Sequence, residues 1–392
     1  MLYSKERHTE ITSVPWNADQ VMDFSSSIMN EAEKLLATSS PLPPHPLDTN
    51  DFSQPLSTMY YGVEGVAWGL QHWGQKTKTK LSFNPIEIFE SRIQQHPEPD
   101  DVSYFFGKTG IRLAIQATQP SEKNLKNLCH DLDSLQNVET NEMMAGAPGA
   151  LIAAQLLWEM NKESSPERIC LLIPKVLGAR NDNDSLKLPI WTQNYVGQSS
   201  IYIGAAHGAV GNIFSLLRAS IHMNKTDLQS IREYAISLLK RTALENETEV
   251  NWPILYSNNN KEPLVHWCHG ATGVVMQLAT LLPIGIDSKF DELMIKAGNL
   301  IWKAGPLKKG ANLCHGTSGS GAALLKLFER TGDEIWLQRA RTLAMATLKQ
   351  IEEDRETYKQ PRYSLWTGDI GAVLFLQACT TGRFFTPMLD VI

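Results

Sequence analysis

The sequence predicts an all-α fold, an α/α toroid in which seven outer helices surround seven inner ones. A Gly-x-x-Gly pair recurs seven times along the 392 residues, at intervals of roughly 40 to 60 residues, which is typical of stacked supersecondary units. Apolar residues at helical spacing follow each pair, and no run of alternating β-branched residues indicates strands. The first glycines of the pairs are Gly62, Gly107, Gly146, Gly208, Gly270, Gly316 and Gly368.

Each repeat is expected to contain one apolar helix and one amphipathic helix. Apolar residues at helical spacing run from Val274 to Leu282, and in the amphipathic stretch 226–241 Thr226 and Gln229 have the spacing of a capping box. Because apolar helices are stable inside a ring of amphipathic ones, a closed toroid is favoured over an open superhelix, which would leave them half exposed. The glycines should let backbones crowd together at one end of the toroid, where we expect the functional site.

The first 55 residues are predicted to form a separate N-terminal segment, and residues 56–392 the toroid. This segment contains one amphipathic helix, residues 18–39, and then the proline-rich stretch Pro41–Leu47. Such a stretch favours polyproline II, the conformation that SH3-type partners bind. A plain linker is the simpler interpretation.

Composition restricts the possible functions. Hydrophobic residues make up 42% and charged residues 20%, which is typical of a globular protein. The net charge of −6, without a cluster of Lys and Arg, argues against nucleic-acid binding. No secretory signal or membrane-spanning run is apparent, and the odd set of five cysteines indicates reduced thiols. We therefore expect a cytoplasmic protein, for which a peripheral membrane contact stays open.

The triplet Cys-His-Gly occurs twice, beginning at Cys268 and at Cys314. The two cysteines and one neighbouring histidine would supply three donors, the number expected for a catalytic zinc ion with an open fourth position. Two sulfur ligands favour thiolate chemistry over hydrolysis, and the common hydrolase motifs are absent. The alternative is that both cysteines are small buried residues between helices, since no Cys-x-x-Cys pair is present.

His207 occupies the equivalent position one repeat earlier, before Gly208. It is a candidate acid that would protonate the carbanion formed when a thiol adds to an activated alkene, and Glu142 is a candidate to orient it or to help in deprotonation. The simpler interpretation of a single histidine is a hydrogen-bonded core residue.

Four segments, YIGAAHGAVG, LVHWCHGATGV, KKGANLCHGTSG and SLWTGDIGAVLFL, resemble those of the eukaryotic lanthionine synthetase C-like (LanC-like) proteins, in the same order. The resemblance extends from about residue 60 to residue 377. It implies a double α/α toroid in which Cys268, Cys314 and His315 bind zinc and His269 lies in the pocket without binding the metal. It also places His207 at the position of the acid/base histidine of the bacterial cyclases, and Glu142 where those enzymes usually carry aspartate.

The resemblance further implies that glutathione is the co-substrate. Lys309 matches a lysine that contacts glutathione, and Arg355 or Arg362 is a candidate for the same role. The implied reaction is addition of the glutathione thiol to dehydroalanine or dehydrobutyrine residues of proteins or peptides. Leu264 and His269 replace a basic residue and a tyrosine of the bacterial cyclases, which argues against lantibiotic ring formation. A non-catalytic adaptor or signalling protein that binds zinc and glutathione is the alternative.

Overall fold

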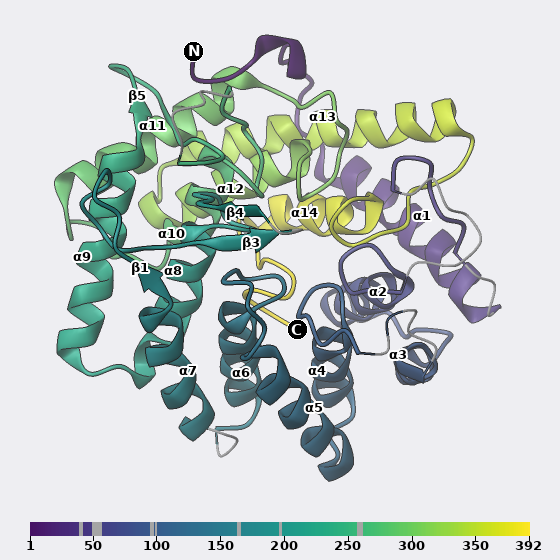
Figure 1. The fold of residues 1–392 in the computed structure, drawn as a ribbon. Coiled ribbons are helices and arrows are strands. Elements are labelled where there is room, and N and C mark those ends of the chain that lie inside the picture. Colours follow the sequence, from purple (N-terminus) through teal and green to yellow (C-terminus); the bar gives the residue numbers. More distant parts are fainter. Residues whose placement is uncertain are drawn as a thin grey trace.

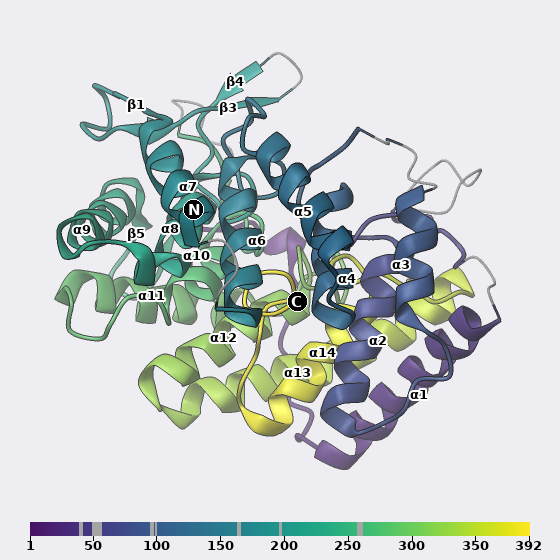
Figure 2. The same ribbon diagram turned by 90° about the horizontal axis from the view of Figure 1, so that it is seen from below.

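The computed structural model describes residues 1–38, 42–48, 57–94, 98, 100–162, 166–195, 198–256 and 262–392. Within these ranges fourteen α-helices alternate between an inner and an outer layer, which confirms the predicted all-α toroid (Figure 1). Viewed from below, the inner helices surround the C-terminal segment (Figure 2). The inner helices are α2 (Val63–Thr77), α4 (Lys108–Thr118), α6 (Ala147–Met160), α8 (Ala209–Arg218), α10 (Ala271–Leu278), α12 (Thr317–Thr331) and α14 (Asp369–Thr381).

The outer helices cover the inner ones. The short strands and one 3-10 turn lie in the connections between helices, and the other 3-10 turn precedes α1. The outer helices are α1 (Ala18–Ala37), α3 (Pro85–Gln94), α5 (Glu122–Leu135), α7 (Pro166–Gly178), α9 (Lys225–Thr242), α11 (Ser288–Ala304) and α13 (Glu334–Tyr358). Three two-stranded antiparallel sheets pair β1 (Arg180–Asn181) with β2 (Ile190–Trp191), β3 (Gln193–Tyr195) with β4 (Gln198–Ser200), and β5 (Leu244–Glu245) with β6 (Val250–Asn251). The 3-10 turns are η1 (Lys5–Arg7) and η2 (Ser220–His222).

The toroid closes where its last inner helix meets its first. Helix α14 packs against α2, and α1 contacts both of them. This closure excludes the open superhelix, because the apolar faces at the two ends of the repeat array cover each other. Helix α1, which belongs to the predicted N-terminal segment, is the outer helix at this junction. The predicted boundary after residue 55 and Pro41 of the proline-rich stretch lie outside the described residues.

The Gly-x-x-Gly pairs mark the inner-helix starts as predicted. The first glycine of each pair is the N-cap of its inner helix, and the second lies in the first turn. The close backbone approach at the second glycines, however, is mainly between the helix start and the preceding loop of the same repeat. A Cβ atom on Gly65 would lie 2.2 Å from the carbonyl oxygen of Met59, and one on Gly371 would lie 1.9 Å from that of Leu365. A side chain is therefore excluded where each helix start meets its own preceding loop.

Two local predictions were wrong. Helix α9 begins at Lys225, and its N-cap is Asn224, whose side chain accepts a hydrogen bond from the backbone N–H of Asp227. Thr226 therefore lies inside the first turn and makes no capping box, because a stronger capping residue stands two positions earlier. Helix α10 ends at Leu278, although its apolar pattern continues to Leu282.

The layers differ in burial as the apolar pattern predicts. Every residue of α6 from Ala147 to Leu157 is buried, whereas α9 buries only one face, which includes Ile231, Ala235 and Leu238. None of the helices in the described ranges is long and apolar enough to cross a bilayer.

Gly110→Ala should lower the free energy of unfolding by about 2 kcal/mol, a typical cost of overpacking. The new Cβ atom would lie 2.3 Å from the carbonyl oxygen of Tyr104, so the loop before α4 would have to move. The matched control is Gly178→Ala at the end of α7, where no atom lies within 4 Å of the added carbon. Urea unfolding measures both variants. Equal stability of the two would show that the tight loop does not constrain the second glycine.

Candidate active site

The loops before the inner helices are joined by backbone hydrogen bonds between equivalent positions, two residues before each first glycine. We call these positions the rim residues. The N–H of one rim residue donates to the carbonyl oxygen of the rim residue in the following repeat, and the last repeat donates to the first. Five such bonds occur in the described part of the chain: Phe105 to Met144 (3.1 Å), Ala206 to Cys268 (3.3 Å), Cys268 to Cys314 (3.3 Å), Cys314 to Trp366 (3.0 Å) and Trp366 to Tyr60 (2.9 Å).

This arrangement brings the predicted site residues together. Cys268 and Cys314 are adjacent rim residues, and His207, His269 and His315 each follow a rim residue directly. The site therefore lies at the N-terminal end of the inner helices, as expected from the glycine pairs. Helix N-termini also present positive dipole ends there, which favours bound anions.

Glu142 reaches the site at Met144, a rim residue whose N–H binds a side chain instead of the next rim residue. The N–H of the rim residue Met144 donates to the Glu142 carboxylate (2.8 Å), and the same oxygen lies 3.2 Å from Nδ1 of His207. Glu142 is fully buried, whereas the His207 side chain is 29% exposed. The pair is thus a buried carboxylate that orients an accessible imidazole, the geometry of an acid/base histidine.

The surroundings give His207, His269 and His266 different pKa values. Burial alone would lower the pKa of His207, but the hydrogen bond and charge of Glu142 outweigh it and raise the pKa above the usual 6.5. Burial, and then the charge of His207, lowers the pKa of His269 to about 4. Burial, and then the charge of His315, lowers the pKa of His266 to about 3. Of these three, His207 is the one whose pKa is raised and not lowered.

The two cysteines interact directly through their thiols. Their mutual hydrogen bond, followed by burial, raises the pKa of Cys268. Burial opposes ionisation of Cys314 too, but the hydrogen bonds of its sulfur with Cys268 and His315 lower the pKa of Cys314 well below its usual value. One thiolate stabilised by a neighbouring thiol and imidazole is a nucleophilic, metal-binding form of sulfur.

The zinc site predicted from the resemblance stays a prediction. Among the described residues, no group of three His, Cys, Asp or Glu side chains is arranged closely enough to hold a metal ion. The donor chemistry nevertheless fits zinc, because the sulfur of Cys314 interacts with both Cys268 and His315. The ring of His269 stacks on that of Tyr202, with centroids 5.9 Å apart.

Two aromatic rim residues complete the site and were not predicted as site residues. Tyr60 is buried and hydrogen-bonds the sulfur of Cys314, and its ring stacks on Trp366 with centroids 6.0 Å apart. Their position two residues before the first glycine, the same as that of both cysteines, was the sequence signal that could have identified them.

The three predicted glutathione contacts differ in their surroundings. Lys309 is exposed, and its positive charge acts on Cys268 and His266. Arg355 pairs with Asp369 (3.1 Å) and Glu31 (2.7 Å). The guanidinium of Arg362 is buried against the carboxylate of Asp48.

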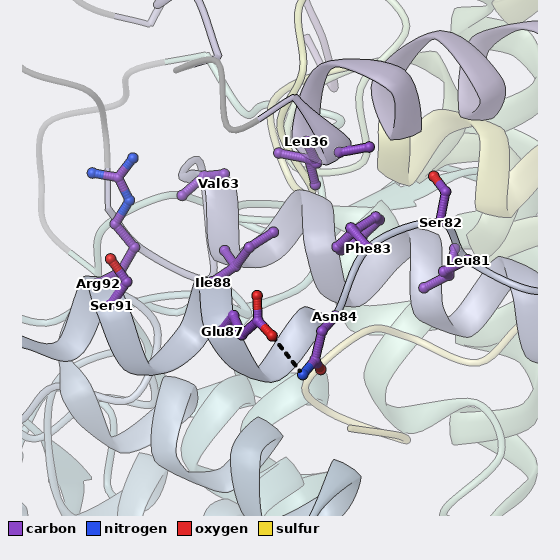
Figure 3. Close-up of a pocket in the computed structure, with 11 residues that line it drawn as sticks. Leu36, Val63, Leu81, Ser82, Phe83, Asn84, Glu87, Ile88, Ser91 and Arg92 are labelled. Atoms are coloured by element: carbon purple, nitrogen blue, oxygen red, sulfur yellow. Dashed lines mark hydrogen bonds between the residues drawn. The ribbon is translucent and has the colours of Figure 1, made fainter.

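A cavity of about 670 Å³ lies away from these residues, between the end of α1 and helices α2 and α3. Leu36, Val63 and Ile88 line it, together with the hydrogen-bonded pair Asn84 and Glu87 (Figure 3). It contains no residue of the candidate active site.

The fold and site define a helical toroid in which two neighbouring cysteines and a buried carboxylate–histidine pair lie at the same rim. The model of the family "Lanthionine synthetase C-like protein" matches residues 54–386, and the chain belongs to this family. Nisin cyclase, a solved structure, has the same fold. It superposes with a TM-score of 0.66 and 17% identity, over 93% of this chain and 95% of that one.

Two relatives are similar in sequence over part of their length. The protein named glutathione S-transferase LANCL1 from Danio rerio is 29% identical over 175 residues, which cover 45% of this chain and 42% of that protein. LanC-like protein GCL1 from Arabidopsis thaliana is 32% identical over 175 residues, which cover 43% of this chain and 39% of that protein. The chain therefore matches less than half the length of either relative.

Glu142→Gln should lower the pKa of His207, because the amide removes the charge while its oxygen can still accept the Met144 N–H. Two-dimensional NMR of the histidine rings measures this. Because the pKa of His207 is raised on folding, the protonated pair contributes stability below the unfolded value of 6.5, and this is lost as pH rises through the folded pKa. The variant should lack this pH dependence.

His222, which packs against Trp158 with ring centroids 4.6 Å apart, is an internal control whose pKa should be the same in both proteins. An unchanged titration of His207 in the variant would contradict its electrostatic coupling to Glu142.

Proposed function

We propose that this protein is a thiol transferase that adds the thiol of glutathione to dehydroalanine or dehydrobutyrine residues of proteins or peptides. The observation that carries the proposal is the neighbouring pair Cys268 and Cys314 at the same rim as the hydrogen-bonded His207–Glu142 pair. The name of the Danio rerio relative, glutathione S-transferase, supports glutathione as the thiol.

The chemistry requires a thiolate and a proton donor. The glutathione sulfur attacks the β-carbon of the dehydroamino acid and forms a C–S bond, while the π electrons of the C=C bond move to the α-carbon. His207 then gives the proton on its imidazolium to the α-carbon, and Glu142 holds the ring and stabilises its charged form. The thiol proton is released when the thiolate forms, so the addition is balanced without an oxidant or a reductant.

Cys268, Cys314 and His315 would hold the zinc ion. When bound, zinc would supply the Lewis acidity that keeps an incoming thiol deprotonated at neutral pH. The positive charge of Lys309 would attract a glutathione carboxylate to the same end of the toroid. His269, whose low pKa keeps it neutral, would bound the pocket next to His207.

Cys314→Ala should remove bound zinc and abolish the glutathione adduct on a dehydroalanine peptide. Cys314 would supply one of the three zinc ligands, and the two that remain, Cys268 and His315, would be too few to hold the ion. Elemental analysis and mass spectrometry measure the two effects. Cys170→Ala, which removes an exposed thiol on α7, is the matched control and should leave both unchanged. A fully metallated Cys314→Ala protein would contradict the assigned ligands.

His207→Asn should slow adduct formation about 100-fold, the lower part of the range for general acid catalysis. Glutathione affinity, measured by calorimetry, should change little, because the imidazole acts in proton transfer. If wild-type protein binds zinc and glutathione but forms no adduct, the catalytic proposal fails and the adaptor alternative stands.

A further inference from the structure

A short segment between α1 and α2, residues 42–48, lies against the end of α13 and the loop before α14. We call it the N-terminal strap. The side chain of Gln360 donates a hydrogen bond to the carbonyl oxygen of Pro44 (3.5 Å), and the ring of His45 meets that of Tyr358 edge-on with centroids 4.7 Å apart. Leu42 of the strap also packs in the hydrophobic core, and His45 is buried.

The last residue, Asp48, makes the strongest contact of the strap. Nε of Arg362 donates to one carboxylate oxygen of Asp48 (3.0 Å), and Nη2 donates to the other (2.6 Å). The hydroxyl of Thr367 donates to the carboxylate as well (2.8 Å), and is itself hydrogen-bonded to Ser364 (2.8 Å). The Arg362 and Asp48 side chains are only 9% and 8% exposed. This is a complete receptor for one carboxylate group.

The receptor lies at the edge of the candidate active site. Thr367 directly follows the rim residue Trp366, whose carbonyl oxygen accepts the N–H of Cys314. The charge of Asp48 also acts on Tyr60, the residue that hydrogen-bonds the sulfur of Cys314. A thiol-bearing peptide with its sulfur at the cysteines therefore has a carboxylate receptor next to it along the rim.

We propose that Asp48 is an internal stand-in for a substrate carboxylate, so that glutathione binds Arg362 by displacing the N-terminal strap. The inference rests on the proposed function and adds an autoinhibitory contact to it. A buried guanidinium is costly to leave unpaired, and Asp48 supplies the counter-charge while the site holds no substrate. A glutathione carboxylate would take the place of the Asp48 carboxylate at Arg362, so the guanidinium would keep a negatively charged partner.

Arg362 and Arg355 differ in how easily their carboxylate partners could be displaced. One partner of Arg355 is Asp369, in the first turn of α14, and the other is Glu31 within α1. Both are fixed on long helices, so neither can leave without moving the packed layers. Asp48 lies on a segment without helix or strand, and its release requires only that the strap be displaced.

Calorimetric titration of glutathione into wild-type protein, Asp48→Asn and Asp48→Ala tests the proposal. Removing the internal carboxylate should tighten glutathione binding about fivefold or more, because the site no longer has to be vacated first. Glutathione diethyl ester, which has no free carboxylate, should bind the Asp48 variants no more tightly than the wild type. The matched control is Asp131→Asn, which removes the partner of Arg112 in another mostly buried Arg–Asp pair (2.6 Å) between α4 and α5. It should leave glutathione affinity unchanged.

Equal or weaker glutathione affinity in both Asp48 variants, with the wild type still binding, would overturn the strap as an internal competitor and leave the proposed function intact. A gain that also appears with the diethyl ester or with Asp131→Asn would overturn it as well, since general loosening would then explain it. If no variant binds glutathione, the proposed function fails together with the inference.

Discussion

The hydrogen bonds between rim residues are the constraint on which the site depends. Each bond joins the starts of two neighbouring inner helices directly through their backbones. Residues that are 46 positions apart in the chain, such as Cys268 and Cys314, therefore become neighbours whose thiols shift each other's pKa. The glycine pairs permit this by removing the side chains that would meet each loop's own carbonyl oxygens. The rim is thus a backbone scaffold that accepts different side chains in each repeat without changing shape.

The rim also explains how equivalent positions acquire different chemistry. At Cys314 the N–H is used in the scaffold, and the sulfur is free to interact with Cys268 and His315. At Met144 the N–H binds the Glu142 carboxylate instead, which holds a buried negative charge next to His207. That charge makes the pKa values of two neighbouring histidines differ. The pKa of His207 is raised, whereas burial lowers the pKa of His269 to about 4.

Much of this organisation could be predicted from the sequence because it is repeated and local. The glycine pairs predicted every inner-helix start, since a clash six residues away along the chain is a local constraint. The neighbouring position of Cys268, Cys314 and His207 followed from the repeat. Competition between nearby capping residues was harder to predict, and Asn224, not Thr226, is the N-cap of α9. The contact of Asp48 with Arg362 was missed because it joins distant segments whose approach depends on closure of the toroid.

Closure links the ends of the chain to the chemistry between them. The junction of α14 with α2 and α1 brings Tyr60 from the first repeat onto Cys314 and places the N-terminal strap beside the last repeat. An open array of the same repeats would keep the thiol pair, which needs only adjacent loops, but it would lose Tyr60 and the Asp48 carboxylate. Under our proposal, the first repeat and the N-terminal strap act on a centre that the middle repeats supply, and a closed toroid is the arrangement that allows this.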